Sequence, residues 1–326
     1  MGDFLPTFSH VQQAAVVLNG VVCRTPVLGS YYLDEQCGGG VLAKCENLQR
    51  TGAFKFRGAY YAISRKEAVA PFKAVVTLSS GNHAQGLALA GRLLGYPAYI
   101  VMPEPVNPFK RMRVEEFGAN VRIVGTRAEG EELAQELVHA HQGVFIHPFN
   151  DPDVIAGQGT AILELLEGEP QLDVVLAPLG GGGLLSGACL AAHGLNPRIQ
   201  VYGCEPARAL DALLSLREGR ILMPHPVDTM AEGLRTSLGD VTLSILQDHL
   251  QDVFVVEEEE IIPAMRIAFE RMKMVIEPSS AVALAPILRG EPVLSGKRVG
   301  VVLSGGNISM SDACSMMEGC ERSTQR

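Results

Sequence analysis

Short apolar strands alternate with helices along most of this chain of 326 residues. The pattern is clearest from residue 73 to residue 148, where the apolar run Ala74–Leu78 precedes a predicted helix over Ala84–Leu94 and a strand over Ala98–Met102. Strands that alternate with helices of this length form βαβ units, in which parallel strands build a sheet covered by helices. The sequence therefore predicts an α/β protein.

Two domains are expected, because the alternation resumes after residue 149. Residues 1–72 and 149–326 are predicted to form a large domain, with residues 73–148 inserted as a small one that closes over substrate. Each domain is predicted to be an open, twisted, mostly parallel sheet flanked by helices. A single helix is expected over Ser280–Leu288, and the polar last dozen residues are expected to fray.

Composition narrows the class of protein. Apolar residues make up 47% and charged residues 19%, which is typical of a globular chain, and no apolar run is long enough for a membrane helix. The net charge of −9 and the absence of a basic stripe argue against a nucleic-acid partner. The seven cysteines include no C-x-x-C pair, and the eight histidines include no H-E-x-x-H motif. With no signal peptide visible, these features predict a cytoplasmic enzyme without disulfides or zinc.

A lysine between two aromatic residues is the first chemical signal. The run Thr51–Gly58 places Lys55 between Phe54 and Phe56, at a predicted strand-to-helix turn. A desolvated lysine has a lowered pKa and is the usual nucleophile for Schiff-base formation with an aldehyde. A surface lysine lying beside two core aromatics is the alternative, and the octapeptide alone favours it. The residues downstream decide between the two.

Four consecutive glycines, Gly180–Gly183, separate a buried strand from a helix that begins near Leu184. Backbone N–H groups can converge on an anion in such a loop, and the helix N-terminus adds partial positive charge. The run matches neither G-x-G-x-x-G nor the P-loop motif, so it suits the phosphate of a small cofactor. A flexible turn remains an alternative, as does a dinucleotide site with Glu205 at the end of the next strand.

Two further loops follow strands. Ser79-Ser80-Gly81-Asn82-His83 precedes a helix, so its amides can bind a substrate carboxylate and its hydroxyls can transfer a proton, although an ordinary helix cap is the alternative. Ser304-Gly305-Gly306-Asn307 follows the last predicted strand. Together with Lys55, these loops are expected to converge at the carboxyl ends of the strands, where open α/β sheets bind ligands.

Five motifs occur in the order and spacing of the fold type II pyridoxal-phosphate enzymes, which have a tryptophan synthase β-like fold. They are TGAFKFRG around Lys55, SSGNHAQG, GGGGLLSG, EPSSA and SGGN. Over nearly its full length the chain resembles the serine racemase and serine/threonine dehydratase group of this family. The resemblance implies that Lys55 holds pyridoxal 5'-phosphate as a Schiff base and that Gly180–Gly183, with Leu184, bind its phosphate. It also implies that Phe54 stacks on the ring, Asn82 contacts the 3-hydroxyl, Glu277 lies in the cofactor site and Ser304 faces the pyridine nitrogen.

The pyridine partner bears on the reaction. A hydroxyl such as that of Ser304 cannot keep the ring nitrogen protonated as an aspartate would, so the ring is a weaker electron sink. That favours β-elimination or rapid reprotonation over transamination. The prediction is a dehydratase (ammonia-lyase) that converts serine, threonine or a similar 3-hydroxy amino acid to a 2-oxo acid and ammonia. By resemblance Ser80 lies opposite Lys55 across the cofactor, which permits serine racemisation as the alternative reaction.

A cation site is implied by the same resemblance. Glu205, the carbonyl of Ala209 and Asp211 would form an all-oxygen site that suits Mg²⁺ or Ca²⁺, with Mn²⁺ as a further option. From spacing alone, a solvated helix start with Glu205 near its N-terminus is favoured.

The chain departs from its relatives at Glu232, where they usually carry aspartate, and Arg235 follows soon after. The hypothesis is that Arg235 binds a second substrate carboxylate, as in 3-hydroxyaspartate. A homodimer is expected from the resemblance, and no motif for a nucleotide effector is visible. An NAD-dependent oxidoreductase would leave Lys55 and Ser304 without purpose, and a non-catalytic amino-acid sensor would not need them.

Overall fold

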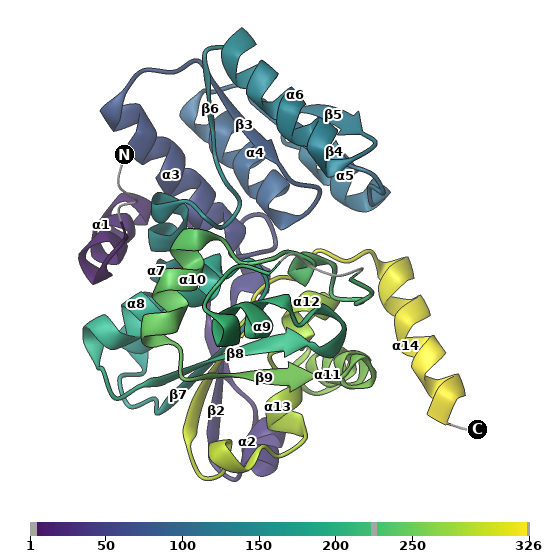
Figure 1. Cartoon of the computed structure of the whole chain (residues 1–326). Helices are drawn as coiled ribbons and strands as arrows, with labels where there is room; N and C mark the ends of the chain where they lie inside the picture. The colour runs from purple at the N-terminus through teal and green to yellow at the C-terminus, as the bar shows by residue number, and fades with distance from the viewer. Residues whose placement is uncertain (1–4, 223–226, 325–326) are drawn as a thin grey trace.

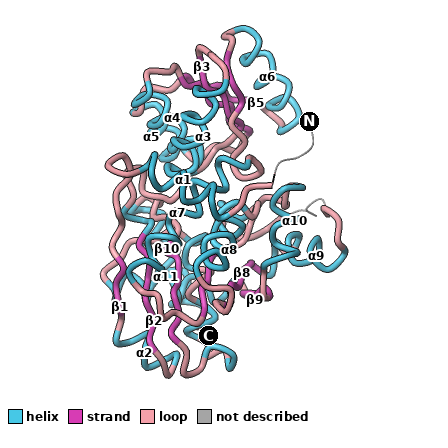
Figure 2. The backbone as a smooth tube through the Cα atoms, turned by 90° about the vertical axis from the view of Figure 1, so that its left-hand side faces the viewer, coloured by secondary structure: helices cyan, strands magenta, loops and turns pink. Residues whose placement is uncertain are grey.

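The computed structural model describes residues 5–222 and 227–324. It contains two sheets flanked by helices, with the smaller sheet above the larger one in the view of Figure 1, and Figure 2 shows the same arrangement from the side. The larger sheet has the order β1-β2-β10-β7-β8-β9, and only β1 runs antiparallel to its neighbour. The smaller sheet has the order β5-β4-β3-β6 and is parallel throughout. The predicted α/β fold with parallel sheets is confirmed.

The strands of the larger sheet are β1 (Val27–Gly29), β2 (Gly40–Cys45), β7 (Val174–Pro178), β8 (Gln200–Pro206), β9 (Asp252–Val256) and β10 (Arg298–Leu303). Those of the smaller sheet are β3 (Ala74–Leu78), β4 (Ala98–Pro103), β5 (Asn120–Val124) and β6 (Gly143–Phe145). The smaller sheet thus falls between residues 74 and 145, while the domain boundaries near residues 73 and 148 stay a prediction.

The helices occur in two groups. Those packed with the smaller sheet are α3 (Lys55–Val69), α4 (Asn82–Leu94), α5 (Pro108–Glu116) and α6 (Arg127–Ala140). The others are α1 (Phe8–Leu18), α2 (Tyr31–Cys37), α7 (Pro152–Gly168), α8 (Gly183–Leu195), α9 (Asp211–Glu218), α10 (Asp240–His249), α11 (Glu258–Met272), α12 (Pro278–Ala281), α13 (Ala285–Leu288) and α14 (Met310–Thr324). Short 3-10 turns are η1 (Glu46–Leu48), η2 (Ala207–Ala209), η3 (Glu232–Leu234) and η4 (Pro292–Leu294).

Alternation along the central strands decides which helices cover which face. In β3, Val75 packs in one core with residues of α3 and α4, whereas Val76 packs on the other face with residues of α6. In β7, Val175 faces α1, α7, α8 and α10, while Val174 faces α2 and α11 to α13. Because both faces are covered, these strands are apolar at consecutive positions, as parallel strands require.

Glycines allow α3 and α7 to approach closely between the two sheets. A Cβ added to Gly58 would lie 2.6 Å from the Val154 carbonyl oxygen, and one on Gly157 would lie 2.6 Å from Cα of Gly58. The helix that begins at Lys55 is therefore packed against the body of the protein along its first turn.

Two expectations about helices are wrong. The predicted helix over Ser280–Leu288 is divided into α12 and α13, and the C-terminal segment expected to fray continues as α14 to Thr324, where it projects from the body in Figure 1. Ser309 caps the N-terminus of α14, since its hydroxyl accepts a hydrogen bond from the amide of Asp312.

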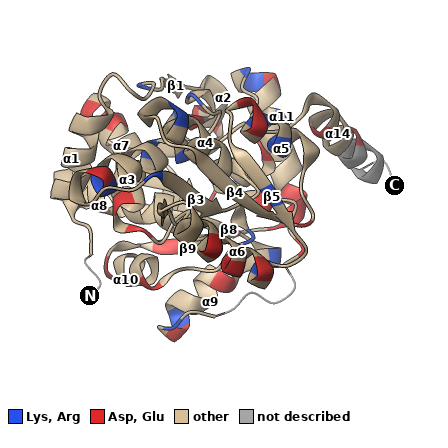
Figure 3. Ribbon diagram, turned by 90° about the horizontal axis from the view of Figure 1, so that it is seen from above, with Lys and Arg blue, Asp and Glu red and all other residues tan. Residues whose placement is uncertain are grey.

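Charges of both signs are interspersed over the elements drawn in Figure 3. Among the described residues, no helix is both long and apolar enough to cross a membrane.

Candidate active site

Lys55 is the first residue of α3 and lies at the meeting point of several loops. Its Nζ donates a hydrogen bond of 2.8 Å to the carbonyl of Pro148 and lies 5.1 Å from the centroid of the Phe54 ring. Burial lowers the pKa of the Lys55 amine from 10.5 to about 8. A neutral, nucleophilic amine is therefore accessible near neutral pH.

The backbone around Lys55 is joined to the loop after β10. The amide of Phe54 donates to the carbonyl of Ser304 at 3.1 Å, and that of Gly306 donates to Gly52 at 2.9 Å. From the other side α4 packs closely, because a Cβ on its Gly86 would lie 3.1 Å from the backbone of Lys55. The lysine is thus positioned by two loops and a helix from distant parts of the chain.

Buried ion pairs hold the first turn of α3, which begins at Lys55, against neighbouring segments. The guanidinium of Arg57 is fully buried and contacts the carboxylates of Glu46 at 2.8 Å and Glu164 at 2.7 Å. Lys44 adds a second cation, 2.7 Å from Glu164. Two cations and two anions balance, and fixed partners are what a buried charge requires.

Pro148 belongs to a turn that His147 shapes. Nδ1 of His147 accepts hydrogen bonds from the amides of Phe149 at 3.3 Å and Asn150 at 2.8 Å. Burial lowers the pKa of His147 to about 4, with a smaller contribution from Lys55 in the same direction, so Nδ1 stays an acceptor at neutral pH. Sequence reasoning did not assign Pro148 to the site, because it contributes a backbone carbonyl, which has no sequence signal.

Asn82 joins three of the predicted loops. Its Nδ2 donates to Oε1 of Glu277, while its Oδ1 accepts from Nδ2 of Asn307 at 2.8 Å. Asn307 also donates to the Thr51 carbonyl at 2.8 Å, next to the lysine run. These bonds fix which end of the Asn82 amide is the donor. Asn307 stood in the SGGN motif, but its linking role depends on contacts that only the fold creates.

The Ser79–His83 loop divides into accessible and buried parts. Ser79, Ser80 and Gly81 are partly exposed, and a Cβ added to Gly81 would meet nothing within 4 Å, so there is space beside the loop. The His83 ring is 2% exposed, with Nε2 3.3 Å from the Ile146 carbonyl. Burial and nearby Lys55 lower the pKa of His83 well below its usual value. The imidazole is therefore neutral and packed inside the protein, out of reach of a substrate. The backbone amide of His83 lies in the first turn of α4.

The glycine loop has no room for side chains. Gly182 has φ of 84° and caps α8, whose first residue is Gly183 and second is the buried Leu184. A Cβ on Gly181 would lie 2.4 Å from Cγ of Phe149, and one on Gly180 would lie 2.9 Å from Cα of Leu234. A buried strand-to-helix turn lined by backbone amides is the arrangement that binds phosphate, so these residues fit such a group.

Glu205 and Asp211 lie at the corner between β8 and α9. Both carboxylate oxygens of Glu205 accept backbone hydrogen bonds, from Ala212 at 2.8 Å and from Leu213 at 2.9 Å. Both oxygens of Asp211 are buried without a hydrogen-bond partner in the protein. Burial raises the pKa of Glu205 to about 8 and that of Asp211 to about 6. Glu205 thus caps the first turn of α9, as the spacing alone favoured, whereas the buried, unpartnered oxygens of Asp211 would fit a bound cation.

Arg235 is occupied elsewhere. Its Nε donates to the carbonyl of Thr229 at 2.8 Å, and its Nη2 contacts the same oxygen. The structure therefore gives no support to the hypothesis that Arg235 binds a substrate carboxylate.

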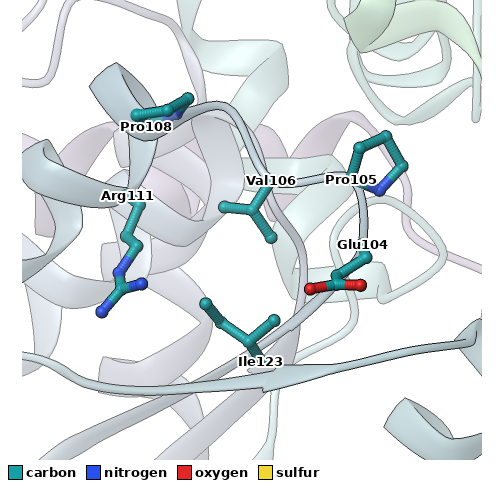
Figure 4. A pocket seen from close by; sticks show the side chains of 6 residues that line it. All are labelled: Glu104, Pro105, Val106, Pro108, Arg111 and Ile123. Carbon is teal, nitrogen blue, oxygen red and sulfur yellow. The ribbon is translucent and has the colours of Figure 1, made fainter.

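A separate hollow of about 580 Å³ lies near the start of α5, and none of the predicted site residues lines it (Figure 4). Its lining residues are Glu104, Pro105, Val106, Pro108, Arg111 and Ile123.

The chain is similar to known proteins along nearly its full length. The chain is 40% identical over 319 residues to L-threo-3-hydroxyaspartate ammonia-lyase of Saccharomyces cerevisiae, covering 97% of this chain and 98% of the relative. It is 42% identical over 306 residues to serine racemase of Arabidopsis thaliana, covering 92% of each. The structure of maize serine racemase superposes with a TM-score of 0.91 at 35% identity, covering 99% of this chain and all of that one.

The family model described as pyridoxal-phosphate dependent enzyme matches residues 18–305. The resemblance found in the five sequence motifs is thereby confirmed, and the chain belongs to the pyridoxal-phosphate dependent enzyme family.

Proposed function

We propose that this protein is a pyridoxal-phosphate dependent ammonia-lyase that removes water and ammonia from a 3-hydroxy amino acid by β-elimination. The observation that carries the proposal is the Lys55 amine, whose pKa is lowered to about 8 where the lysine, serine and glycine-containing loops meet. Relatives that bear the names L-threo-3-hydroxyaspartate ammonia-lyase and serine racemase, with about 40% identity, support this chemistry.

Named residues would hold the cofactor. Gly180–Gly183 and the first turn of α8, including Leu184, would bind the phosphate through backbone amides. Phe54 would contact the ring, with Asn82 and Glu277 at its 3-oxygen and Ser304 at its nitrogen. Bound pyridoxal phosphate supplies an aldehyde that links to an amine and a ring that withdraws electrons from the substrate Cα. Lys55 is the amine that would carry it.

Lys55 would also move the proton. A neutral Nζ beside the substrate Cα could accept the Cα proton, because burial disfavours the charged form of the amine. The Pro148 carbonyl, which accepts a hydrogen bond from Nζ at 2.8 Å, orients the amine. Ser304 would donate a hydrogen bond to the ring nitrogen without protonating it, which would favour loss of the β-hydroxyl over transamination.

Ser79–His83 would bind the substrate α-carboxylate through amides at the N-terminus of α4. The hydroxyl of Ser80 would face the substrate from the side opposite Lys55, where it can deliver or remove a second proton. Racemisation of serine is therefore the second candidate function, and relatives named serine racemase support it.

A bound Mg²⁺, Ca²⁺ or Mn²⁺ at Glu205, Ala209 and Asp211 is also part of the proposal. The unpartnered oxygens of Asp211 support it. Chelation is expected to lower the melting temperature of the wild type, and Asp211→Asn should make the protein indifferent to chelator. A wild type whose melting temperature ignores chelator would leave Glu205 as a simple helix cap.

We further propose a homodimer in the cytoplasm. The cytoplasm is supported by the free thiols of Cys23, Cys37, Cys45, Cys189, Cys204 and Cys314, which suit a reducing compartment.

Incubation with single amino acids tests the activity. L- and D-serine, L-threonine and both diastereomers of 3-hydroxyaspartate should be supplied separately, with 2-oxo acid and chirality assayed together. We expect 2-oxo acid from at least one L-substrate, and its loss in Lys55→Ala with the fold intact by circular dichroism. Appreciable turnover in Lys55→Ala would overturn the mechanism. Product racemate without 2-oxo acid would favour the second candidate function.

A further inference from the structure

Lys110 is a buried cation that the proposed mechanism does not use. It lies in the first turn of α5, its side chain is 9% exposed, and its Nζ is 2.6 Å from Oε2 of Glu232. Glu232 begins η3, which belongs to the segment between β8 and β9 of the larger sheet, whereas α5 packs with the smaller sheet. The ion pair therefore links an element packed on the smaller sheet to a segment that connects two strands of the larger sheet.

The pair lies beside the candidate active site. Next to Glu232, the amide of Gly233 donates to Oγ of Ser279 at 2.8 Å, two residues after Glu277. Leu234, also in η3, is the residue whose Cα lies against Gly180 of the glycine loop. Burial raises the pKa of the Glu277 carboxyl, and Lys110 opposes that rise while Glu232 adds to it. Lys110 and Glu232 are thus within electrostatic reach of the carboxylate that orients Asn82.

The two partners differ in their access to water. The side chain of Glu232 is 45% exposed, so its carboxylate can turn into solvent and be hydrated at small cost. Lys110 cannot be hydrated in the same way, and a buried ammonium is stable only beside an anion. An anionic group that enters the site could therefore replace Glu232 on Lys110, whereas a neutral substrate would leave the pair intact.

We propose that Lys110 binds the second carboxylate of a dicarboxylic 3-hydroxy amino acid and that Glu232 holds the lysine when no such substrate is bound. The inference rests on the proposed function and names the substrate class of the same site. The α-carboxylate would be held by the Ser79–His83 loop, and the distal carboxylate would form a charge-assisted hydrogen bond with Nζ of Lys110. Serine and threonine lack the second carboxylate and gain nothing from this contact.

Comparison of L-threo-3-hydroxyaspartate with L-serine tests the proposal in Lys110→Met, Lys110→Arg and Glu232→Gln. Loss of a hydrogen bond to a charged group corresponds to about a ten- to a hundredfold change. We expect Lys110→Met to lower kcat/KM for hydroxyaspartate by that factor more than for serine. Lys110→Arg should retain most of the preference. Glu232→Gln should lower KM for hydroxyaspartate relative to serine, because the competing anion is gone.

Arg113→Met serves as the matched control, since Arg113 lies on the same helix and pairs with the half-exposed Glu116. Both substrates should be processed by this variant as by the wild type. Equal losses on both substrates in Lys110→Met would overturn the inference and leave the proposed function standing. So would a wild type that processes serine but not hydroxyaspartate.

A binding measurement separates this inference from the proposed function if the wild type turns over neither substrate. Succinate, with two carboxylates, should raise the melting temperature of the wild-type holoenzyme more than butyrate does. That difference should vanish in Lys110→Met and persist in Arg113→Met. The same succinate effect in Lys110→Met would overturn the inference, whatever the activity.

Discussion

Lys55 combines two properties that an exposed lysine lacks. Burial lowers the pKa of its amine to about 8, so a larger fraction is unprotonated at physiological pH than in an exposed lysine, and its Nζ is held by the Pro148 carbonyl. The octapeptide around Lys55 alone favoured a surface lysine beside two core aromatics. The loops that surround Lys55 in the folded chain exclude that explanation.

The pH dependence of cofactor uptake follows from this pKa. Only the unprotonated amine attacks an aldehyde, and the folded-state pKa of Lys55 is lowered to about 8. The rate at which apoenzyme takes up pyridoxal phosphate should therefore rise from about pH 6.5 and level off above about pH 9. Stopped-flow absorbance would measure it, with Lys55→Ala as a control that forms no covalent adduct. A rate that is flat over this range would contradict the lowered pKa.

Arg57 illustrates a buried charge that serves stability. Its guanidinium is fully buried between Glu46 and Glu164, so Arg57→Met leaves two carboxylates without their main partner. We expect a loss of about 3–5 kcal/mol in the free energy of unfolding, measured in urea. Arg24→Met removes an exposed pair with Glu167 and should cost less than about 1 kcal/mol. Equal losses in the two variants would contradict the role assigned to burial.

At the scale of elements, the glycine loop depends on contacts with Phe149. A methyl group at Gly181 would lie 2.4 Å from the Phe149 ring, which packs under the loop. Gly181→Ala should therefore displace the ring, weaken pyridoxal-phosphate binding and lower stability by about 1–3 kcal/mol. Fluorescence titration of the cofactor and thermal unfolding would measure both effects.

Gly168→Ala is the matched control, because Gly168 ends α7 and a Cβ there would meet nothing within 4 Å. Cofactor affinity in that variant should equal the wild type. If Gly181→Ala bound the cofactor as tightly, the loop would not require glycine at that position.

Elements whose signals are local were well predicted. Strand β3 has the predicted bounds Ala74–Leu78, because it is an apolar run between helices, and β10 ends at Leu303, directly before the predicted loop Ser304–Asn307. The region after Ser280 was predicted as one helix but is divided, with Pro286 in the first turn of α13. Proline lacks an amide hydrogen and clashes with the preceding turn, so the helix begins anew there. α14 was missed because polar composition at a chain end resembles a frayed segment, although Ser309 caps its N-terminus.

At the scale of the whole molecule, the proposed cofactor residues come from both sheets and from widely separated segments. Asn82 and Glu277, whose side chains are hydrogen-bonded, are 195 positions apart. A cofactor that contacts all of these loops binds the folded chain and not the unfolded one.

The holoenzyme should therefore unfold at a higher temperature than the apoenzyme. A ligand at about 100 times its dissociation constant stabilises by about 2.7 kcal/mol. Differential scanning calorimetry with pyridoxal phosphate removed and then restored would measure the shift, with Lys55→Ala showing a smaller one. Equal melting temperatures for apoenzyme and holoenzyme would contradict the assembly of the site from both sheets.

Local pattern in the sequence was sufficient for the α/β class, the order of most strands and helices, and the motifs around Lys55, Asn82 and Gly180–Gly183. These depend on periodicity, on glycine and on residues that follow strands, all of which are visible within a few positions. The fold alone decided that Asn307 and Glu277 orient Asn82, that Pro148 holds the lysine, that Arg235 is occupied by Thr229 and that Lys110 meets Glu232. Such contacts join residues far apart in the chain, and no short-range signal carries them, because packing of two separate sheets brings them together.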